Sequence, residues 1–201
     1  MHRDYSLTAK DSLFYSFKEI TDVFAAIERD KSFQDRFNKV VESLIECYKN
    51  GGRIYFVGNG GSAADSQHLA AEFVSRLEND RRPLPAEALT ADTSVLTALG
   101  NDYGFDEVFA RQVDAKIHRN DVLIAISTSG NSRNIIRALK LCKERGSSRV
   151  LLTGASGGEA SKHCEYILNV PSNRTTTIQE LHIVLGHAVC RAVECSVIAN
   201  S

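Results

Sequence analysis

The chain has 201 residues, a formal net charge of −1 and a hydrophobic content of 43%. This length is enough for one domain with a sizeable core, and the nearly balanced charge argues against general binding to nucleic acids or to membrane surfaces. We expect no membrane span, because no apolar run approaches the roughly 20 residues that a span needs, and no signal peptide, because residues 1–10 lack its pattern. Five cysteines without CxxC spacing predict reduced thiols in a cytoplasmic protein.

Within a single domain over residues 1–201, residues 1–50 are predicted to form a pair of amphipathic helices. The apolar stripe of the first helix advances in steps of four and three: Leu13, Phe17, Ile20, Phe24 and Ile27. The second helix carries an apolar stripe over residues 33–48, with Asp30 or Ser32 as its cap, and ends at residues 50–52. These stripes could cover the chain's own sheet or pair with copies of themselves in an oligomer, and the sequence leaves both alternatives open.

Residues 51–201 alternate short apolar runs with helical patterns. The predicted strands span residues 54–57, 86–90, 122–126, 149–153 and 166–170, and the predicted helices include residues 63–79, 93–99, 105–118 and 176–197, with a loop at 100–104. This alternation predicts an α/β fold, in which helices cover both faces of a five-stranded parallel sheet to form a three-layer α/β/α sandwich. Ligands in such sheets bind beyond the carboxyl ends of the strands. The turns at residues 58–62 and 127–132 should therefore be two walls of one site.

The second of these turns, with the sequence STSGNS, has the composition of an anion cradle. It lies between a buried strand and a helix start, where unpaired backbone N–H groups and the helix dipole favour negative charge. The hydroxyls able to donate to a phosphate belong to Ser127, Thr128, Ser129 and Ser132. An ordinary helix cap needs only one such residue, so we favour a phosphate site. The chain has no Walker A lysine here, which argues against hydrolysis of nucleoside triphosphates.

Two later segments carry side chains suited to catalysis or metal binding. His68 and Glu72 are four residues apart on the helix after the first turn and share one face. On the last helix, Gln179 and His187 are eight residues apart, which separates them by about 80° in azimuth, so both can face one cleft. These groups could bind a divalent metal or supply a carboxylate base and an imidazole acid beside a carbonyl. The sequence pattern alone does not bring the two helices together.

Four motifs, in order, resemble the sugar isomerase (SIS) family, and within it the phosphoheptose isomerases. They are GNGGSAADSQHLAAEF, GNDYGF, ISTSGNSRN and IQELHIVLGH, and the similarity runs from about Arg53 to the C-terminus. The resemblance implies a flavodoxin-like SIS fold. It also implies interconversion of sedoheptulose 7-phosphate and glycero-manno-heptose 7-phosphate through an enediol. That reaction is the first step toward the ADP- or GDP-heptose used in lipopolysaccharide or other surface glycans.

The resemblance also assigns roles to residues. Glu72 would be the base and His187 its acid partner, and zinc in metal-containing members is bound at the positions of His68, Glu72, Gln179 and His187. Substrate contacts would come from Asn59, Gly60, Gly61, Ser62, Glu72, Asn101, Asp102, Ser127, Thr128, Ser129, Ser132 and Gln179. The family implies a homotetramer with sites at subunit interfaces and no nucleic-acid or membrane partner. Residues 174–177 depart from the familiar family pattern, which carries a charged residue there.

A second hypothesis is a non-catalytic SIS protein that binds a replication initiator or senses sugar phosphates. The initiator-binding relative keeps the phosphate turn but lacks the glutamate and the last-helix histidine. This chain has both Glu72 and His187, which favours the enzyme. A sugar-phosphate-sensing regulator is disfavoured because no DNA-binding region accompanies the domain.

Overall fold

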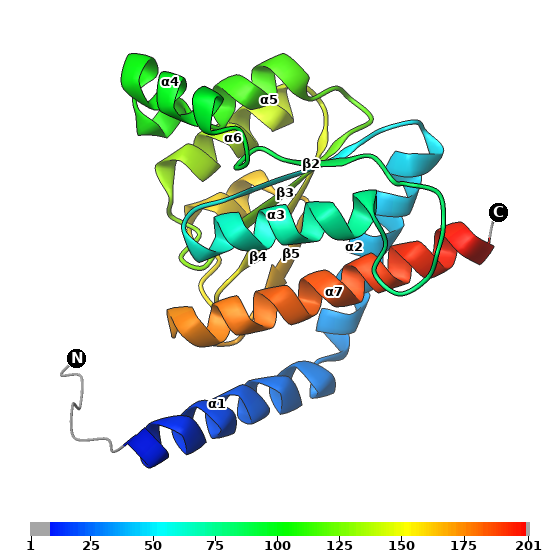
Figure 1. The fold of residues 1–201 in the computed structure, drawn as a ribbon. Helices are drawn as coiled ribbons and strands as arrows, with labels where there is room; N and C mark the ends of the chain where they lie inside the picture. Colours follow the sequence, from blue (N-terminus) through cyan, green and yellow to red (C-terminus); the bar gives the residue numbers. More distant parts are fainter. Residues whose placement is uncertain (1–8, 200–201) are drawn as a thin grey trace.

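A five-stranded parallel sheet forms the centre of the fold (Figure 1). Its strands are β1 (Ile54–Gly58), β2 (Ala86–Ala88), β3 (Val122–Ser127), β4 (Ser148–Thr153) and β5 (Tyr166–Asn169). They are ordered β2-β1-β3-β4-β5, and every neighbouring pair is parallel. The strand order reverses between β1 and β3, the place where flavodoxin-like sheets bind their ligands. The predicted fold class is confirmed.

Helices cover both faces of this sheet in the computed structural model, which describes residues 9–199. Residues 1–10 are predicted not to be a signal peptide, and residues 1–8 of that segment lie outside the described part. One face is covered by α2 (Lys31–Lys49), α3 (Gly61–Val74) and α7 (Thr175–Ala199), and the other by α5 (Ala110–Lys116) and α6 (Arg133–Glu144). Successive strand residues point to opposite faces of the sheet. In β1, Phe56 packs toward α2, α3 and α7, whereas Tyr55 and Val57 pack toward α5 and α6.

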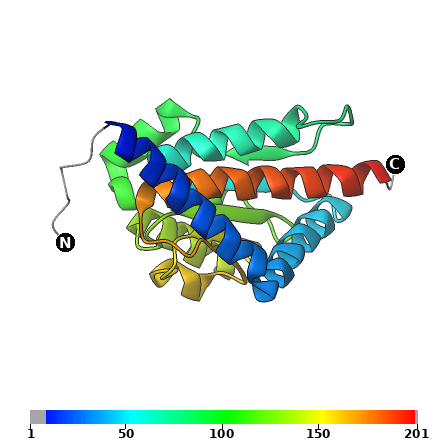
Figure 2. The ribbon, with the colours of Figure 1, turned by 90° about the horizontal axis from the view of Figure 1, so that it is seen from below.

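The two N-terminal helices pack differently. In α2, Asp30 rather than Ser32 is the cap, because its carboxylate accepts the Ser32 N–H at 2.9 Å, and the apolar stripe is buried on the chain's own sheet. In contrast, α1 (Ala9–Arg29) crosses the outer side of α7 (Figures 1 and 2). Its predicted stripe is only partly covered, since Leu13, Phe17 and Phe24 are 51%, 55% and 40% exposed. Among the described residues, the core therefore covers Ile20 and Ile27 of this stripe better than the other three.

Three predicted helix or loop boundaries are wrong, and the strand predicted over residues 86–90 ends at Ala88. The helix predicted over residues 63–79 ends at Val74, where Arg81 binds its last carbonyls. The predicted loop at 100–104 is mostly helical, because α4 (Thr93–Tyr103) is capped by Asp92 and continues to Gly104, whose φ of 86° ends it. The helix predicted over residues 105–118 is divided into the 3-10 turn η1 (Phe105–Glu107) and α5. A second 3-10 segment, η2 (Glu159–His163), precedes β5.

The last helix bears on the expectation that the chain has no membrane span. Among the described helices, α7 alone is long and apolar enough to cross a membrane, with a mean hydropathy of 1.5 over its most apolar window. However, it packs against α2 and α3, and it buries His182 and Glu194 completely. The core helix of a globular domain meets the same criterion, so this finding is weak evidence for a membrane segment.

Candidate active site

The turn after β3 is built by hydrogen bonds among its own residues. The Gly130 N–H donates to the carbonyl and the hydroxyl oxygen of Ser127, both at 3.2 Å, and the Asn131 N–H donates to Ser129 Oγ at 3.1 Å. Because these hydroxyl oxygens act as acceptors, their own protons remain available to a bound anion. Ser132 occupies the N-cap position of α6 without a side-chain capping hydrogen bond. Ser132 thus does not cap α6 through its side chain, and the phosphate cradle stays a prediction.

A glycine-rich loop after β4, residues 154–158, packs closely against the backbone of this turn. Gly130 has a φ of 64°, and a Cβ there would lie 2.0 Å from the Gly157 carbonyl oxygen. Similarly, a Cβ on Gly158 would lie 2.4 Å from the Ser129 carbonyl oxygen. Both glycines are therefore needed for the close approach of two backbones. A cavity of about 230 Å³ opens between the two loops and the start of α7, lined in part by Thr128, Ser129 and Asn131.

A pair of side-chain amides joins this turn to the turn after β1. Asn59 Nδ2 donates to Asn134 Oδ1 and Asn134 Nδ2 donates to Asn59 Oδ1, each at 2.9 Å. Asn134 Oδ1 also accepts a hydrogen bond from the Ile135 N–H at 2.9 Å, and this satisfies one of the backbone donors in the first turn of α6. Asn134 is 2% exposed. The two predicted walls of the site are thus connected across the β1/β3 switch point, as the sheet order requires.

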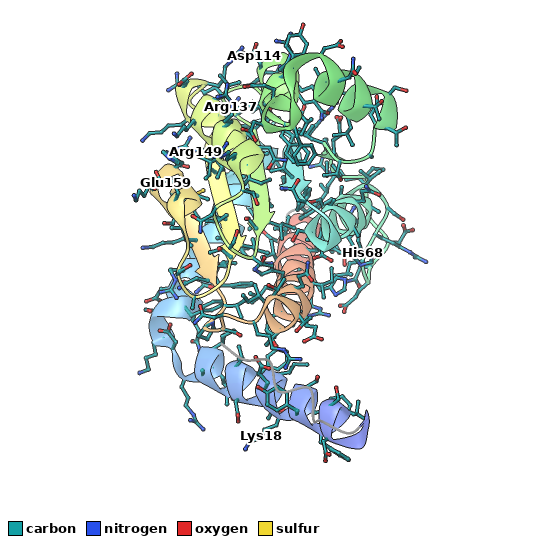
Figure 3. The ribbon with its side chains drawn as sticks, turned by 90° about the vertical axis from the view of Figure 1, so that its left-hand side faces the viewer. Lys18, His68, Asp114, Arg137, Arg149 and Glu159 are labelled. Carbon is teal, nitrogen blue, oxygen red and sulfur yellow. The ribbon has the colours of Figure 1, made fainter. Side chains whose placement is uncertain are left out.

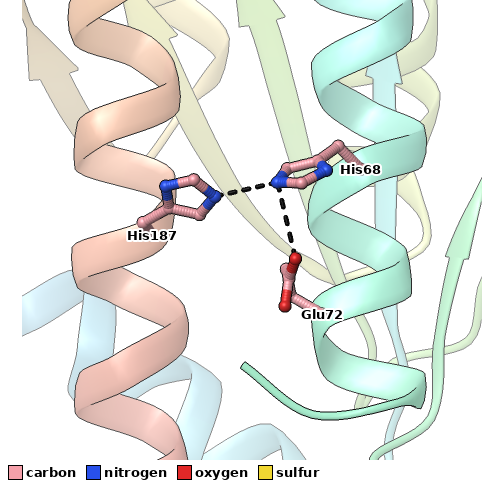
Figure 4. A group of neighbouring side chains, drawn as sticks. All are labelled: His68, Glu72 and His187. Carbon is pink, nitrogen blue, oxygen red and sulfur yellow. Dashed lines mark hydrogen bonds and ion pairs between the residues drawn. The ribbon is translucent and has the colours of Figure 1, made fainter. Parts of the chain in front are cut away.

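The predicted catalytic residues come together between α3 and α7 (Figure 4). His68 Nε2 lies 2.8 Å from His187 Nε2 and 3.4 Å from Glu72 Oε1, and the candidate ligand atoms of all three residues lie within 4.8 Å of one another. The helices pack closely beside this cluster, since a Cβ on Gly186 would lie 2.6 Å from Leu69 Cδ1. The structure supplies the step that the sequence pattern could not, which is the meeting of the two helices.

The cluster of His68, Glu72 and His187 allows two kinds of chemistry. Two imidazoles that face each other through Nε2 need one donor and one acceptor nitrogen, so a single proton can lie between them. The Glu72 carboxylate beside them is 18% exposed and accepts protons or metal ions. An open surface remains on one side, because the His68 side chain is 49% exposed. These are the groups needed for proton transfer to and from a bound substrate.

The same donor set fits a catalytic zinc ion. Two histidines and one glutamate are a known ligand set of catalytic zinc sites, which leave a further position open. Ligands about 2.1 Å from a tetrahedral metal lie roughly 3.4 Å apart, which matches the separation of His68 and Glu72. The two histidine nitrogens, at 2.8 Å, would have to separate by roughly half an ångström to take up that geometry.

Other predicted site residues lie near the cluster or at a distance from it. Gln179 is about 12 Å from His187 along the axis of α7, and its amide lies against the turn after β1, because a Cβ on Gly61 would be 2.6 Å from Gln179 Nε2. Its role as a fourth ligand stays a prediction. Asn101 and Asp102 lie on the exposed last turn of α4, where they hydrogen-bond to each other at 2.8 Å. The divergent segment begins with Arg174, which pairs with Glu19 of α1.

Sequence reasoning assigned no role to two supporting features. Asn134 lies within the quoted motif ISTSGNSRN, and a buried asparagine in the first helical turn was the available signal. The loop at residues 154–158 had a signal in its glycines, of which Gly157 and Gly158 have positive φ. By contrast, a cavity of about 600 Å³ lies at the opposite edge of the sheet and contains no predicted site residue. Its volume alone does not indicate a functional site.

Comparison with known proteins identifies the family. Residues 16–154 match the model of the SIS domain. The chain is 51% identical over 179 residues to a phosphoheptose isomerase of Aneurinibacillus thermoaerophilus, an alignment that covers 89% of this chain and 90% of that one. The structure of phosphoheptose isomerase from Neisseria gonorrhoeae is similar with a TM-score of 0.87 and 42% identity, covering 94% and 100% of the two chains. A phosphoheptose isomerase from Francisella tularensis gives the same TM-score at 33% identity, covering 93% and 98%. The chain therefore belongs to the SIS domain family, and within it to the phosphoheptose isomerases.

Proposed function

We propose that this chain is an aldose–ketose isomerase that interconverts sedoheptulose 7-phosphate and D-glycero-D-manno-heptose 7-phosphate. The observation that carries this proposal is the meeting of His68, Glu72 and His187 between α3 and α7, two helices that each begin beside one of the two predicted walls of the site. That turn would bind the phosphate, and the cluster would act on the carbonyl end of the sugar. The product would enter the synthesis of ADP- or GDP-heptose for lipopolysaccharide or other surface glycans.

In the proposed mechanism, Glu72 is the base. Its carboxylate removes a proton from C1 of the ketose, next to the carbonyl carbon, and the electrons of that C–H bond form the carbon–carbon double bond of an enediol. His187 donates a proton to the carbonyl oxygen as this bond forms. Glu72 then returns its proton to C2, and the C1 hydroxyl gives its proton to His187, which leaves the aldose and restores both groups. His68 contacts both Glu72 and His187 and would hold the two side chains in position relative to each other.

We also propose one zinc ion per subunit, bound by His68, Glu72 and His187. Gln179, the additional ligand predicted from the resemblance, lies about 12 Å from His187 along α7, so it would have to move toward the cluster to bind the same ion. When bound, the ion would take the place of the His187 proton, because a metal-bound imidazole nitrogen carries none, and it would polarise the oxygen atoms of the substrate as a Lewis acid. Purified protein should contain about one equivalent of zinc by mass spectrometry, and His68→Ala should lose most of it. Zinc-free wild-type protein with full activity would contradict a catalytic role for the metal.

A homotetramer is the assembly that we propose. The support is the apolar stripe of α1, in which Leu13, Phe17 and Phe24 remain 40–55% exposed in the described part of the chain. Phe17→Asp combined with Phe24→Asp should break the assembly, because a charge buried in an interface is costly. The double variant should sediment as a smaller species than the wild type. An intact assembly would place these side chains outside the interface.

The cytoplasm is the proposed location, without a nucleic-acid or membrane partner. Support comes from the cysteines, because Cys47, Cys142, Cys164, Cys190 and Cys195 are all free thiols.

The test of the activity is direct. Purified protein is incubated with sedoheptulose 7-phosphate, with and without a chelator, and the aldose is measured. Formation of D-glycero-D-manno-heptose 7-phosphate is the expected result. Tight binding of the sugar phosphate without turnover, in metal-replete protein, would favour the non-catalytic alternative.

A further inference from the structure

A buried ion pair connects the loop that follows α3 to the C-terminal half of α7, where the loop passes this helix in Figure 1. Arg81 Nε lies 3.2 Å from Glu194 Oε1, and the two side chains are 4% and 0% exposed. The Glu194 carboxylate also accepts three consecutive backbone N–H groups, those of residues 77, 78 and 79, at 3.0–3.1 Å. A single carboxylate on α7 therefore determines the path of this loop.

The other nitrogens of Arg81 bind the end of α3. Nη2 donates to the Glu72 carbonyl oxygen at 2.8 Å, and Nη1 donates to the Phe73 carbonyl oxygen at 2.9 Å. These carbonyls belong to the last turn of the helix and have no partner within it. One of them is the carbonyl of Glu72, the predicted base. The guanidinium thus closes the helical turn from which the reactive carboxylate projects.

Glu194 and His187 share one face of α7. They are seven residues apart, which at about 100° per residue returns to nearly the same azimuth roughly 10 Å further along the axis. Helix α7 therefore contacts α3 and its following loop at two points on the same face. His187 meets His68 at the first point, and Glu194 meets Arg81 at the second.

We propose that Arg81 and Glu194 are positioning residues that hold the last turn of α3 against α7, so that Glu72 stays aligned with His68 and His187. This inference rests on the proposed role of the cluster. Buried ion pairs contribute little net stability, because desolvation offsets their attraction, so stability alone is a weak explanation for this pair. A planar guanidinium reaches several acceptors in a fixed geometry, which a lysine ammonium cannot reproduce.

The chain offers a matched control pair. Arg149 is also nearly buried, with 6% exposure, and it binds Glu165 at 2.5 Å and the His163 carbonyl oxygen at 2.8 Å. It lies far from His68 (Figure 3). Arg149→Lys should therefore damage a comparable network without reaching the site.

The experiment compares Arg81→Lys, Glu194→Gln and Arg149→Lys by steady-state kinetics, thermal unfolding and ¹⁵N NMR of the histidine rings. For Arg81→Lys and Glu194→Gln we expect kcat to fall about tenfold or more. The KM for sedoheptulose 7-phosphate should change less than about threefold, because Arg81 and Glu194 do not contact the proposed phosphate turn. The ring signals of His68 and His187 should move and that of His163 should not. Arg149→Lys should show the reverse pattern, with a shifted His163 signal and an unchanged kcat.

Two outcomes would overturn the proposal. One is a folded Arg81→Lys or Glu194→Gln protein with wild-type kcat. The other is a lower melting temperature with unmoved His68 and His187 signals, which would make the pair only structural. Glu194→Gln keeps the side-chain shape, so it decides the question if Arg81→Lys does not fold. The NMR comparison does not depend on which residue is the base, so failure of the positioning role remains distinguishable from failure of the proposed mechanism.

Discussion

The two halves of the candidate site are built in different ways. The hydroxyl-rich turn, which we propose as the phosphate turn, consists of consecutive residues, 127–132. Its backbone and hydroxyl groups bind one another, so much of its shape follows from local sequence. In contrast, the cluster of His68, Glu72 and His187 joins residues up to 119 positions apart on two helices. Its geometry depends on how α3 and α7 pack, and hence on side chains that never touch the substrate. Substitutions should therefore separate the two halves, affecting substrate binding at the turn and turnover at the cluster.

The largest effect is expected at the cluster. Glu72→Gln keeps the shape of the side chain but removes its basicity, so kcat should fall by about 100-fold or more, roughly 3 kcal/mol, with little change in KM. Steady-state kinetics with sedoheptulose 7-phosphate would measure this. Glu42→Gln on the exposed surface of α2 is the control and should leave both constants unchanged. A comparable rise in KM in Glu72→Gln would remove the division between the two halves.

The other histidine of α7, His182, gives a pH-dependent effect of similar size on stability. Burial lowers the pKa of His182 to about 4, and the nearby Thr153 backbone offsets only part of this decrease. Neither ring nitrogen of His182 forms a hydrogen bond of normal geometry within the described residues. The unfolded chain therefore binds more protons than the folded one between pH 6.5 and 4. The free energy of unfolding should fall as the pH decreases through this range, by at most about 3 kcal/mol. Urea unfolding at several pH values would show this slope in wild type and a smaller one in His182→Leu. Equal slopes would contradict it.

A smaller effect is expected at the phosphate turn. Ser127→Ala or Ser129→Ala should raise KM about tenfold, because a hydrogen bond to a charged group contributes about 1.5 kcal/mol or more. Turnover at saturation should change little, since the cluster is intact. The matched control is Ser43→Ala, whose hydroxyl binds a backbone carbonyl of α2. Wild-type KM in both folded variants of the turn would show that it does not bind the phosphate.

The smallest effect concerns the connection between the two walls. Asn134→Ala removes two hydrogen bonds to Asn59 and should weaken kcat/KM by a few fold, about 1 kcal/mol. Asn59→Ala should have a related effect, and the double variant should lose less than the sum of the two single losses. Additive losses would show that the amide pair does not couple the walls.

The same contrast explains what the sequence could predict. The apolar runs and turn residues predicted five parallel strands and a hydroxyl-rich turn after β3, because these depend on local pattern and on general rules of sheet topology. The predicted loop at 100–104 failed because Gly100 and Asn101 look like turn residues, whereas the Asp92 cap and the Gly104 stop determine the length of α4. His68, Glu72 and His187 could be named, yet no pattern showed that α3 and α7 meet. The Arg81–Glu194 pair was not visible at all, because charged residues are usually exposed.

Deuterium exchange tests the central claim most directly. In heavy water, the wild-type protein should introduce deuterium at the carbon next to the carbonyl of the sugar phosphate, because the base removes a proton there and exchanges it with solvent. Glu72→Gln should bind the same substrate with nearly unchanged affinity and introduce little or none. Undiminished labelling by folded Glu72→Gln would contradict the account, because proton abstraction would then depend on another base.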